Sequence, residues 1–414
     1  MSNRRPGRAV VTGIGVIAPN GQRTDAYWKS VREGIGVLDL ISREGCDHLP
    51  LRVAGEVRSF DPAALIEDRF LVQTDRFSHF AMAAAALALE DAGLGGDIAE
   101  PFSVGVVTAA GSGGGEFGQR ELQKLWGKGS KFVGPYQSIA WFYAASTGQI
   151  SIRGGLKGPC GVVASDEAGG LDSLAHASRA VRRGTDVMVV GAAEAPLAPY
   201  SMVCQLGYPE LSTVDDPALA YRPFTEKASG FVPAEGGALL VVEDEERART
   251  RGVPVRAVVA GHAATFTGAS RWAESREGLA RAISGALDEA GCAPEEIDVV
   301  FADAMGVPEA DRAEALAIAD ALGAHGRRVP VTAPKTGIGR AYCAAPVLDT
   351  VAAVLAMDHG QVPPTPNVFD ICHDLDLVMS HARPAELRTA LVLSRGLMGS
   401  NAALVVRRGD DSAR

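Results

Sequence analysis

The sequence of 414 residues contains the same order of segments twice, and this repetition restricts the possible folds more than any other feature. Residues 8–13 (RAVVTG) resemble residues 256–261 (RAVVAG), and residues 88–93 (ALEDAG) resemble residues 286–291 (ALDEAG). Generic alternation of strands and helices in a chain rich in alanine and valine is the competing explanation. Two further matches in the same order favour two related halves: the apolar stretches Val104–Ala109 and Val299–Ala302, and the closing stretches 237–242 (GALLVV) and 402–406 (AALVV).

Within each half, the pattern predicts helices alternating with buried strands. Thr74–Asp91 places apolar residues on one helical face, with Thr74 as the expected N-cap and Gly93 as the expected stop. Ser103–Ala110 is continuously apolar, as in a parallel strand that is covered on both faces. We therefore predict an α/β protein with one half in residues 1–250 and the other in residues 251–414, packed in layers.

Composition excludes several classes of function. The chain has 50 acidic and 40 basic residues, a net charge of −10, and no block of five like charges, which argues against nucleic-acid binding. Its six cysteines include no C-x-x-C pair, so we expect neither a metal site nor a disulfide framework, and we expect a reducing cytoplasm. No run of 18 apolar residues predicts a membrane span.

A glycine-rich stretch after the predicted strand resembles a nucleotide-binding loop only in part. Gly113, Gly115 and Gly118 have the G-x-G-x-x-G spacing, but the acidic residue that usually binds the ribose is missing about 20 positions on. We therefore expect no nucleotide cofactor.

The segment from Cys160 to Ser173 predicts an elbow between a strand and a helix. A short apolar strand ends at Ala164, and Asp166 and Glu167 then precede the helix. The partial positive charge of a helix N-terminus favours an anion, which predicts an ionised Glu167. Capping of the helix by Asp166 or Glu167 is an equally good explanation of these residues.

Several of these segments resemble the β-ketoacyl synthases, and the resemblance covers essentially the whole chain. It rests on residues 9–15 (AVVTGIG) and on residues 223–238, which contain Pro223-Phe224 and a glycine-rich strand start. It implies the thiolase-like α/β/α/β/α fold built from two similar halves. In that family the elbow carries a nucleophilic cysteine before a small-Gly-Leu-Asp run. Counting back from Gly170, this position is Glu167.

The resemblance also implies that the family's two catalytic histidines are replaced, by Asp303 and Arg340, while Lys335 and Glu314 are retained. A carboxylate cannot take the place of a thiolate in acyl transfer, so we expect no catalytic residue here. We hypothesise that Glu167 and Arg340 form a buried ion pair, and that Lys335 pairs with Glu314 in a structural role.

One branch of the family has this profile: the chain-length factors, or ketosynthase β subunits, of bacterial type II aromatic polyketide synthases. Residues 299–303 (VVFAD), 307–314 (VPEADRAE), 116–122 (EFGQREL) and 140–143 (AWFY) are similar to that branch. The resemblance implies a heterodimer with a catalytic ketosynthase α subunit that accepts malonyl units from an acyl carrier protein. It also implies that this chain shapes a tunnel for the growing poly-β-ketone and thereby sets its length.

The same resemblance suggests which residues meet substrate and partner. The tunnel wall would lie in the segment after the strand, at Gly111, Ser112, Gly113, Gly115, Phe117 and Gly118. Close approach of backbones is the alternative reason for these glycines. The partner interface would lie within residues 136–145, at Tyr136, Trp141, Phe142 and Tyr143, unless these aromatic residues belong to the core.

Three other functions compete with the length-setting subunit. The first is a malonyl-acyl-carrier-protein decarboxylase that uses Glu167 and provides the starter unit. The second is a condensing enzyme that uses another cysteine, although neither Cys160 nor Cys343 occupies the nucleophile position. The third is a homodimeric binding protein on an inactive thiolase scaffold.

Few bulky side chains follow the apolar strand Ser103–Ala110, in residues 111–118. We therefore predict a roomy tunnel and a long product, longer than an octaketide. Gly115→Phe should shorten the product, because one misplaced bulky side chain costs about 1–3 kcal/mol of overpacking against the chain end. Mass spectrometry of the products made with an α subunit measures this, and an unchanged product distribution would contradict it.

Overall fold

The computed structural model describes residues 7–96, 100–268 and 272–409, and two halves of the chain follow the same path in it. Five strands of each half have the same spatial order, and the halves join where β1 and β8 pair in antiparallel fashion. The first half orders β1 (Ala9–Ile17), β7 (Gly236–Asp244), β6 (Val187–Glu194), β4 (Val104–Ala109) and β5 (Cys160–Val163). The second orders β8 (Ala257–Phe266), β15 (Ser400–Arg408), β14 (Thr389–Arg395), β9 (Val299–Phe301) and β10 (Pro330–Thr332), with β12 (Asp376–Leu377) at its edge.

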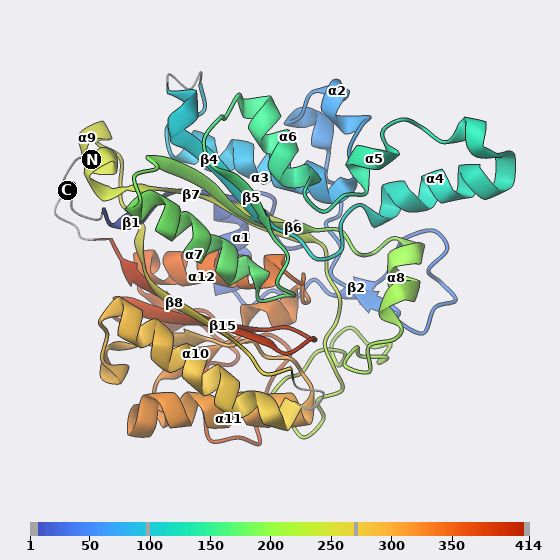
Figure 1. Cartoon of the computed structure of the whole chain (residues 1–414). Helices are drawn as coiled ribbons and strands as arrows, with labels where there is room; N and C mark the ends of the chain where they lie inside the picture. The colour runs from blue at the N-terminus through green and yellow to red at the C-terminus, as the bar shows by residue number, and fades with distance from the viewer. Residues whose placement is uncertain (1–6, 97–99, 269–271, 410–414) are drawn as a thin grey trace.

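Helices separate and cover the two parts of this sheet (Figure 1). Helices α7 (Gly169–Arg182) and α12 (Ala344–His359) contact strands of both halves and therefore form a middle layer. Helix α3 (Arg76–Asp91) covers the first half, and α10 (Ser275–Ala290), with α11 (Pro308–Leu322) against it, covers the second. Residues 344–357 of α12 are all buried, as expected for a helix that is apolar on every side. The predicted five-layer, thiolase-like fold is confirmed.

Smaller elements connect these layers. The other helices are α1 (Thr24–Arg32), α2 (Asp68–Leu71), α4 (Gly115–Lys128), α5 (Gln137–Ala140), α6 (Ala145–Gly154), α8 (Pro199–Gln205) and α9 (Glu245–Arg251), the last of which links the halves. Short strand pairs form between β2 (Asp39–Leu40) and β3 (Val53–Ala54), and between β11 (Gln361–Val362) and β13 (Arg383–Pro384). Single 3-10 turns span Pro62–Ala64, Pro101–Ser103, Ser130–Phe132, Trp272–Glu274, Pro294–Glu296, Gly323–Arg327 and Pro334–Gly337.

Residues 115–143, which contain α4 and α5, extend from the body and are called the arm below (Figure 1). No helix in the described part of the chain is long and apolar enough to span a bilayer.

The start of α3 differs from the sequence prediction. Asp75, not Thr74, is the N-cap, and its carboxylate accepts the N–H of Phe77 at 3.2 Å. The Thr74 hydroxyl instead donates to the carbonyl of Phe70 at 2.6 Å. The other oxygen of Asp75 accepts the N–H of Phe117 at 2.6 Å, so this residue also holds the first turn of α4. Threonine and aspartate both suit an N-cap, so the residue types alone do not show which of them caps α3. The contact of Asp75 with α4 is a tertiary contact that distinguishes it from Thr74.

The repeated sequence matches correspond to repeated close contacts. A Cβ on Gly13 of β1 would lie 2.2 Å from the carbonyl oxygen of Ala88 in α3. A Cβ on Gly261 of β8 would lie 2.3 Å from the carbonyl oxygen of Ala286 in α10. The pairing register also shifts at the same place in both strands, between residues 11 and 13 of β1 and between residues 259 and 261 of β8. Each glycine therefore allows a central strand to touch its covering helix.

We expect Gly13→Ala and Gly261→Ala each to lower the free energy of unfolding by about 1–3 kcal/mol, because the new methyl group meets backbone that cannot move aside. Gly127→Ala is the matched control, since nothing lies within 4 Å of a Cβ at this position within α4. Urea unfolding of the three variants measures the effect. Equal stability of Gly13→Ala and Gly127→Ala would contradict the close contact.

Candidate functional site

The predicted elbow is present between β5 and α7. Asp166 adopts the left-handed conformation with φ of 58°, which turns the chain sharply before the helix. Its carboxylate accepts the N–H of Met398 at 2.6 Å, and its carbonyl accepts the Sγ–H of Cys343 at 3.0 Å. The elbow is therefore attached to the β14–β15 turn and to the start of α12.

Glu167 is buried at the elbow, with only 3% of its surface exposed. One carboxyl oxygen accepts the N–H of Leu397 at 2.8 Å, and the other has no hydrogen-bond partner among the described residues. Burial raises the pKa of Glu167 well above its usual value, and nearby Arg340 only partly opposes this. The prediction that the helix N-terminus keeps Glu167 ionised is wrong, because desolvation is the larger effect. Neither Asp166 nor Glu167 caps α7.

A cavity of about 300 Å³ opens beside Glu167. Of the six predicted tunnel residues, Gly111, Ser112 and Gly115 line it, whereas Gly113, Phe117 and Gly118 do not. The remaining lining residues come from the elbow, from α8 and the segments flanking it, from the start of α12 and from the β14–β15 turn: Asp166, Glu167, Pro196, Tyr200, Ser201, Cys204, Gln205, Tyr208, Tyr342, Cys343 and Leu397. The cavity wall therefore combines three tyrosines with small polar residues and the two carboxyl groups of the elbow.

The predicted glycines have different roles. A Cβ on Gly113 would lie 2.6 Å from the carbonyl oxygen of Trp141, and its φ is 62°, so this glycine serves backbone contact. A Cβ on Gly111 would have only ordinary contacts, the nearest at 3.5 Å. A Cβ on Gly115 would meet only the Ser201 hydroxyl, at 2.1 Å, and the end of a serine side chain can rotate away.

Sequence reasoning missed Glu194, which holds this loop in place. It ends β6, is fully buried, and accepts the N–H of Gly111 at 2.6 Å. Its other oxygen accepts the N–H of Ser112 at 3.3 Å and the Ser112 hydroxyl. An acidic residue at the end of an apolar strand was the available signal, because a buried carboxyl group needs donors nearby.

Asp303 and Arg340, which the sequence resemblance aligns with two catalytic histidines, form an ion pair with each other. Arg340 Nη2 lies 2.8 Å from Asp303 Oδ1, and both side chains are buried. Arg395 Nε lies 3.1 Å from Asp303 Oδ2. The predicted ion pair between Glu167 and Arg340 is therefore wrong, because the guanidinium group of Arg340 binds Asp303 instead.

Arg395 extends this network to Glu314, at 2.9 Å. Glu314 also accepts the N–H groups of Asp303 at 2.6 Å and Ala304 at 2.9 Å. Sequence reasoning missed Arg395, although a charged residue at the end of the apolar strand β14 was a usable signal. Burial alone would raise the pKa of Asp303, but Arg340, Arg395 and Lys335 outweigh it and lower that pKa.

Lys335 forms its own buried pair. Its Nζ lies 2.6 Å from Asp349 of α12 and donates to the carbonyl oxygens of Ala302 at 2.8 Å and Asp303 at 3.1 Å. The predicted pair between Lys335 and Glu314 is therefore wrong. Burial raises the pKa of Asp349 to about 6 despite Lys335, so this carboxyl group is mainly ionised at neutral pH.

The site offers little nucleophilic chemistry. Glu167 places a carboxyl group at the elbow, and burial raises the pKa of the nearby Cys343 thiol well above its usual value. Cys160 is exposed on β5 and does not line the cavity, whereas Cys204 does. Among the described residues, no group of three or more His, Cys, Asp and Glu side chains is arranged to hold a metal ion.

The four predicted interface residues lie on the surface rather than in the core. Tyr136, Trp141, Phe142 and Tyr143 are 39–51% exposed and follow one another along the arm. Their exposure removes the core alternative, and their role as an interface stays a prediction.

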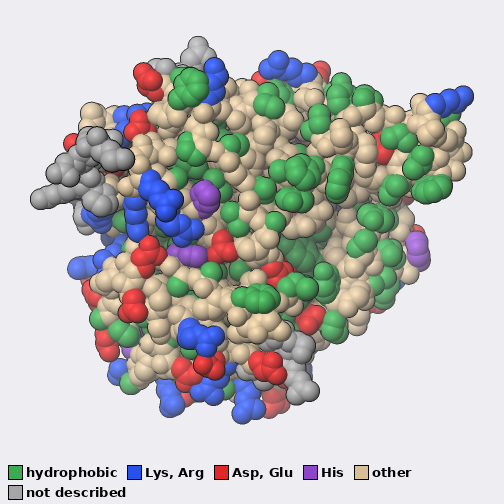
Figure 2. All heavy atoms as spheres, in the orientation of Figure 1, with side chains coloured by type: hydrophobic (Ala, Val, Ile, Leu, Met, Phe, Trp, Pro, Cys, Tyr) green, Lys and Arg blue, Asp and Glu red, His purple; other side chains and the backbone are tan. Residues whose placement is uncertain are grey.

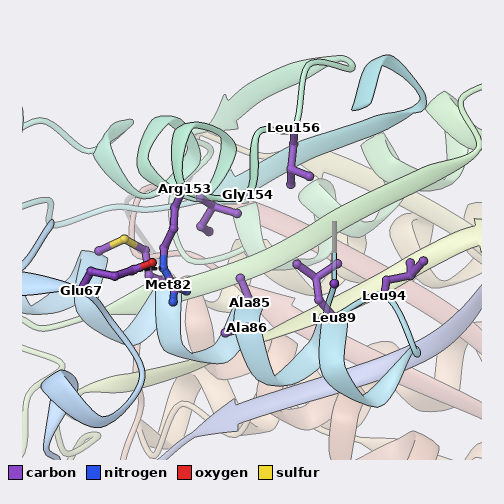
Figure 3. A pocket seen from close by; sticks show the side chains of 12 residues that line it. Glu67, Met82, Ala85, Ala86, Leu89, Leu94, Arg153, Gly154 and Leu156 are labelled. Atoms are coloured by element: carbon purple, nitrogen blue, oxygen red, sulfur yellow. Dashed lines mark hydrogen bonds and ion pairs between the residues drawn. The ribbon is translucent and has the colours of Figure 1, made fainter. Parts of the chain in front are cut away.

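A second cavity, of about 360 Å³, lies between α3 and α6 (Figure 3). Its lining includes the alkyl side chains of Met82, Ala85 and Leu89, and the ion pair of Arg153 with Glu67 stands at one end. None of the predicted site residues lines it.

We expect Asp303→Ala to lower the free energy of unfolding by about 3–5 kcal/mol, because two buried guanidinium groups lose their carboxylate. Asp320→Ala is the matched control, since it breaks the exposed pair with Arg276, and it should change stability little. Thermal unfolding measures both variants. Similar melting temperatures of Asp303→Ala and Asp320→Ala would contradict a stabilising role for the buried network.

The protonated state of Glu167 predicts a pH dependence of stability. The unfolded chain loses this proton near pH 4.5, whereas the folded chain retains it, so the stabilising contribution of Glu167 falls as pH rises above about 4.5. Glu167→Gln removes this dependence. We expect the free energy of unfolding of Glu167→Gln, relative to that of the unchanged chain, to increase between about pH 5 and about pH 8. Urea unfolding at several pH values measures both proteins. If their free energies of unfolding change with pH in parallel, the raised pKa of Glu167 is contradicted.

Comparisons with known proteins agree with the fold. Residues 7–248 match the beta-ketoacyl synthase N-terminal domain, and residues 256–369 match the C-terminal domain of the same family. A polyketide beta-ketoacyl synthase 2 of Streptomyces cyaneus is 77% identical over 99% of this chain and 98% of its own. The tetracenomycin polyketide synthase ketoacyl synthase beta subunit of Streptomyces glaucescens is 48% identical over 97% of this chain and 99% of its own.

Solved structures are similar over the whole chain. The ishigamide ketosynthase/chain length factor matches with a TM-score of 0.89 at 28% identity, covering 98% of this chain and 100% of that one. A type II polyketide ketosynthase solved in complex with its acyl carrier protein matches with a TM-score of 0.86 at 27% identity, over 97% and 100%. The chain belongs to the beta-ketoacyl synthase family, on the branch of the ketosynthase β subunits of type II polyketide synthases.

Proposed function

We propose that this protein is a non-catalytic ketosynthase subunit that pairs with a catalytic α subunit and sets the chain length of an aromatic polyketide. The observation that carries the proposal is the state of the three residues that the sequence resemblance aligns with catalytic residues. Glu167 is a buried carboxyl group, and Asp303 and Arg340 neutralise each other in an ion pair. Neither a thiolate nor an imidazole is available there for acyl transfer or decarboxylation.

The need for a second subunit follows from the absence of a thiolate and an imidazole at these positions and from the names of two relatives. A chain that cannot accept an acyl group needs a second subunit with an intact site. The 48% identical relative is named a beta subunit, and a solved neighbour combines a ketosynthase with a chain length factor. We infer that the α subunit receives malonyl units from an acyl carrier protein and that both subunits enclose the poly-β-ketone.

The surface offers a place for the α subunit. Strand β5 ends the sheet and pairs only with β4 among the described strands, so its outer edge can accept another strand. The arm presents four exposed aromatic side chains at Tyr136, Trp141, Phe142 and Tyr143. Aromatic residues are enriched in stable interfaces, and an apolar surface of this kind favours a permanent partner.

Length control would depend on the loop between β4 and α4. Gly111, Ser112 and Gly115 leave the cavity beside the elbow open, and Glu194 fixes the course of the loop. We infer that side chains at these positions limit the number of extensions and that the present residues suit a long product. Gly113, Phe117 and Gly118 act on the loop backbone or the arm rather than on this cavity.

The alternative, a malonyl-carrier-protein decarboxylase that uses Glu167, has less support. A decarboxylase must stabilise the negative charge that develops on an enolate. A neutral carboxyl group could donate one hydrogen bond, but Arg340, the nearest cation of the network, is bound to Asp303. The scattered, unpaired cysteines of the sequence support a cytoplasmic location as part of the proposal.

A reconstitution tests the proposal: this chain, an α subunit, an acyl carrier protein and malonyl donors are combined, and each component is omitted in turn. Polyketide should appear only with both subunits, and Glu167→Ala should leave the yield within about twofold, because no step uses that carboxyl group. Mass spectrometry measures products and acetyl-carrier protein. Release of acetyl-carrier protein by this chain alone, abolished by Glu167→Ala, would support the decarboxylase instead.

The partner surface has its own control within this experiment. Trp141→Ala should weaken assembly with the α subunit at least tenfold in analytical ultracentrifugation, because a central aromatic contact is lost. Phe369→Ala is the matched control, since Phe369 is 79% exposed but lies outside the arm and β5. Equal effects of both substitutions would contradict the proposed surface.

A further inference from the structure

Tyr342 has a backbone conformation that is rare for a tyrosine. Its φ is 46°, in the left-handed region that glycine adopts freely and that a residue with a Cβ avoids. Its carbonyl accepts the N–H of Ala345 at 3.0 Å, so this residue forms the turn that leads into α12. Residues held in such conformations cluster at functional sites, because the surrounding structure must supply the free energy that they cost. Glycine would form the same turn at a lower cost, so the tyrosine side chain must contribute something that glycine cannot.

The side chain of Tyr342 lies in the wall of the cavity beside Glu167 and connects two parts of that wall. Its hydroxyl donates to Oε1 of Gln205, the last residue of α8. Its ring stands edge-on to the ring of Phe231, with 6.1 Å between the two centroids. Edge-to-face contact is a preferred arrangement of two aromatic rings. The ring of Tyr342 is therefore held both at its face and at its hydroxyl end.

Gln205 transmits this contact to α8. Its side chain is buried, and its Nε2 donates to the carbonyl oxygens of Pro196 at 2.8 Å and Ser201 at 3.1 Å. Both ends of the amide group are thus hydrogen-bonded. Movement of this side chain would leave buried polar atoms without partners, which is costly. Tyr342 therefore fixes α8 relative to the start of α12.

One side of α8 faces the cavity. Ser201, Cys204 and Gln205 line the cavity, and their spacing of three and four residues places them on the same side of the helix. A Cβ on Gly115 would lie 2.1 Å from the Ser201 hydroxyl, so this side of α8 also faces the loop before α4. On the outer side, Val203 is 52% exposed, and hydrophobic side chains gather over this helix in Figure 2. The position of α8 therefore sets the width of the cavity between this helix and the loop.

We propose that Tyr342 is a specificity-determining residue that limits how far a growing poly-β-ketone enters this cavity. The proposal rests on the proposed function, and it adds a residue before α12 to the loop residues Gly111 and Gly115 as a determinant of chain length. The ring takes up space that a longer chain would need. The hydroxyl keeps α8, a helix of only seven residues, from moving aside when the chain end presses against it.

The test compares the products of four complexes. Each contains an α subunit and either the unchanged chain, Tyr342→Ala, Tyr342→Phe or Tyr27→Phe. Tyr27→Phe is the matched control, because the buried hydroxyl of Tyr27 also donates to α12, at the carbonyl oxygen of Leu348 at 3.0 Å, but Tyr27 does not line the cavity. An acyl carrier protein and malonyl donors complete the reaction, and mass spectrometry gives the ratio of longer to normal chains.

We expect Tyr342→Ala to raise the ratio of longer to normal chains at least about fivefold, because loss of the ring relieves overpacking against the chain end. Tyr342→Phe keeps the ring but releases α8, so it should raise the ratio about twofold. Tyr27→Phe should leave the ratio unchanged. A purely structural role of Tyr342 would lower the yield without changing this ratio. An unchanged ratio in both Tyr342 variants, or an equal rise in Tyr27→Phe and Tyr342→Phe, would overturn the proposal.

A second measurement decides the case in which Tyr342→Ala does not assemble. Gln205→Met removes the other side of the same hydrogen bond and keeps a side chain of similar volume. In the assembled complex, Tyr342→Phe and Gln205→Met should each make the amide hydrogens of α8 exchange about fivefold faster, and the double variant should be no faster. Unchanged exchange of α8 in both single variants would overturn the proposal, because Tyr342 would then not fix this helix.

Failure of the proposed function gives a different result. If the unchanged chain and the α subunit form no polyketide, the proposed function is wrong, and the role of Tyr342 is overturned with it. If the complex forms polyketide of the same length with every Tyr342 variant, the proposed function stands and only the role of Tyr342 is overturned.

Discussion

The carboxylate of Asp303 and the two guanidinium groups on it are the interaction on which the rest of the site depends. Arg340 and Arg395 are buried and bring their charge into a region without water. Taking such ions out of water costs several kcal/mol each, so each must meet an opposite charge in good geometry. Glu314 and Asp349 complete the balance with Arg395 and Lys335. The network joins the ends of β9 and β14 to α11 and α12.

This pairing also determines the state of the elbow. Because Arg340 binds Asp303, Glu167 receives no ion pair, and burial raises its pKa well above the usual value. The adjoining cavity is lined by three tyrosines, by small polar residues and by the two carboxyl groups of the elbow. The elbow, the β14–β15 turn and the start of α12 thus form a structural junction beside the cavity.

Apolar side chains and unpaired backbone groups lie on the surface at two places. Tyr136, Trp141, Phe142 and Tyr143 of the arm are 39–51% exposed. Strand β5 ends the sheet and pairs only with β4 among the described strands. Surfaces of both kinds favour a lasting interface with another chain.

Sequence alone determined the fold, while the tertiary structure decided how the buried side chains of Glu167, Asp303 and Arg340 interact. Repeated short-range patterns were sufficient for the two halves, because Gly13 and Gly261 meet helices that lie next to their own strands. The ion pairs were mispredicted, because the partners of Asp303 and Lys335 lie on other layers of the fold. Arg395 is 92 residues from Asp303 in the sequence. No local pattern encodes which of several buried charges will meet, since that depends on the packing of whole layers, and burial then decides which groups stay ionised.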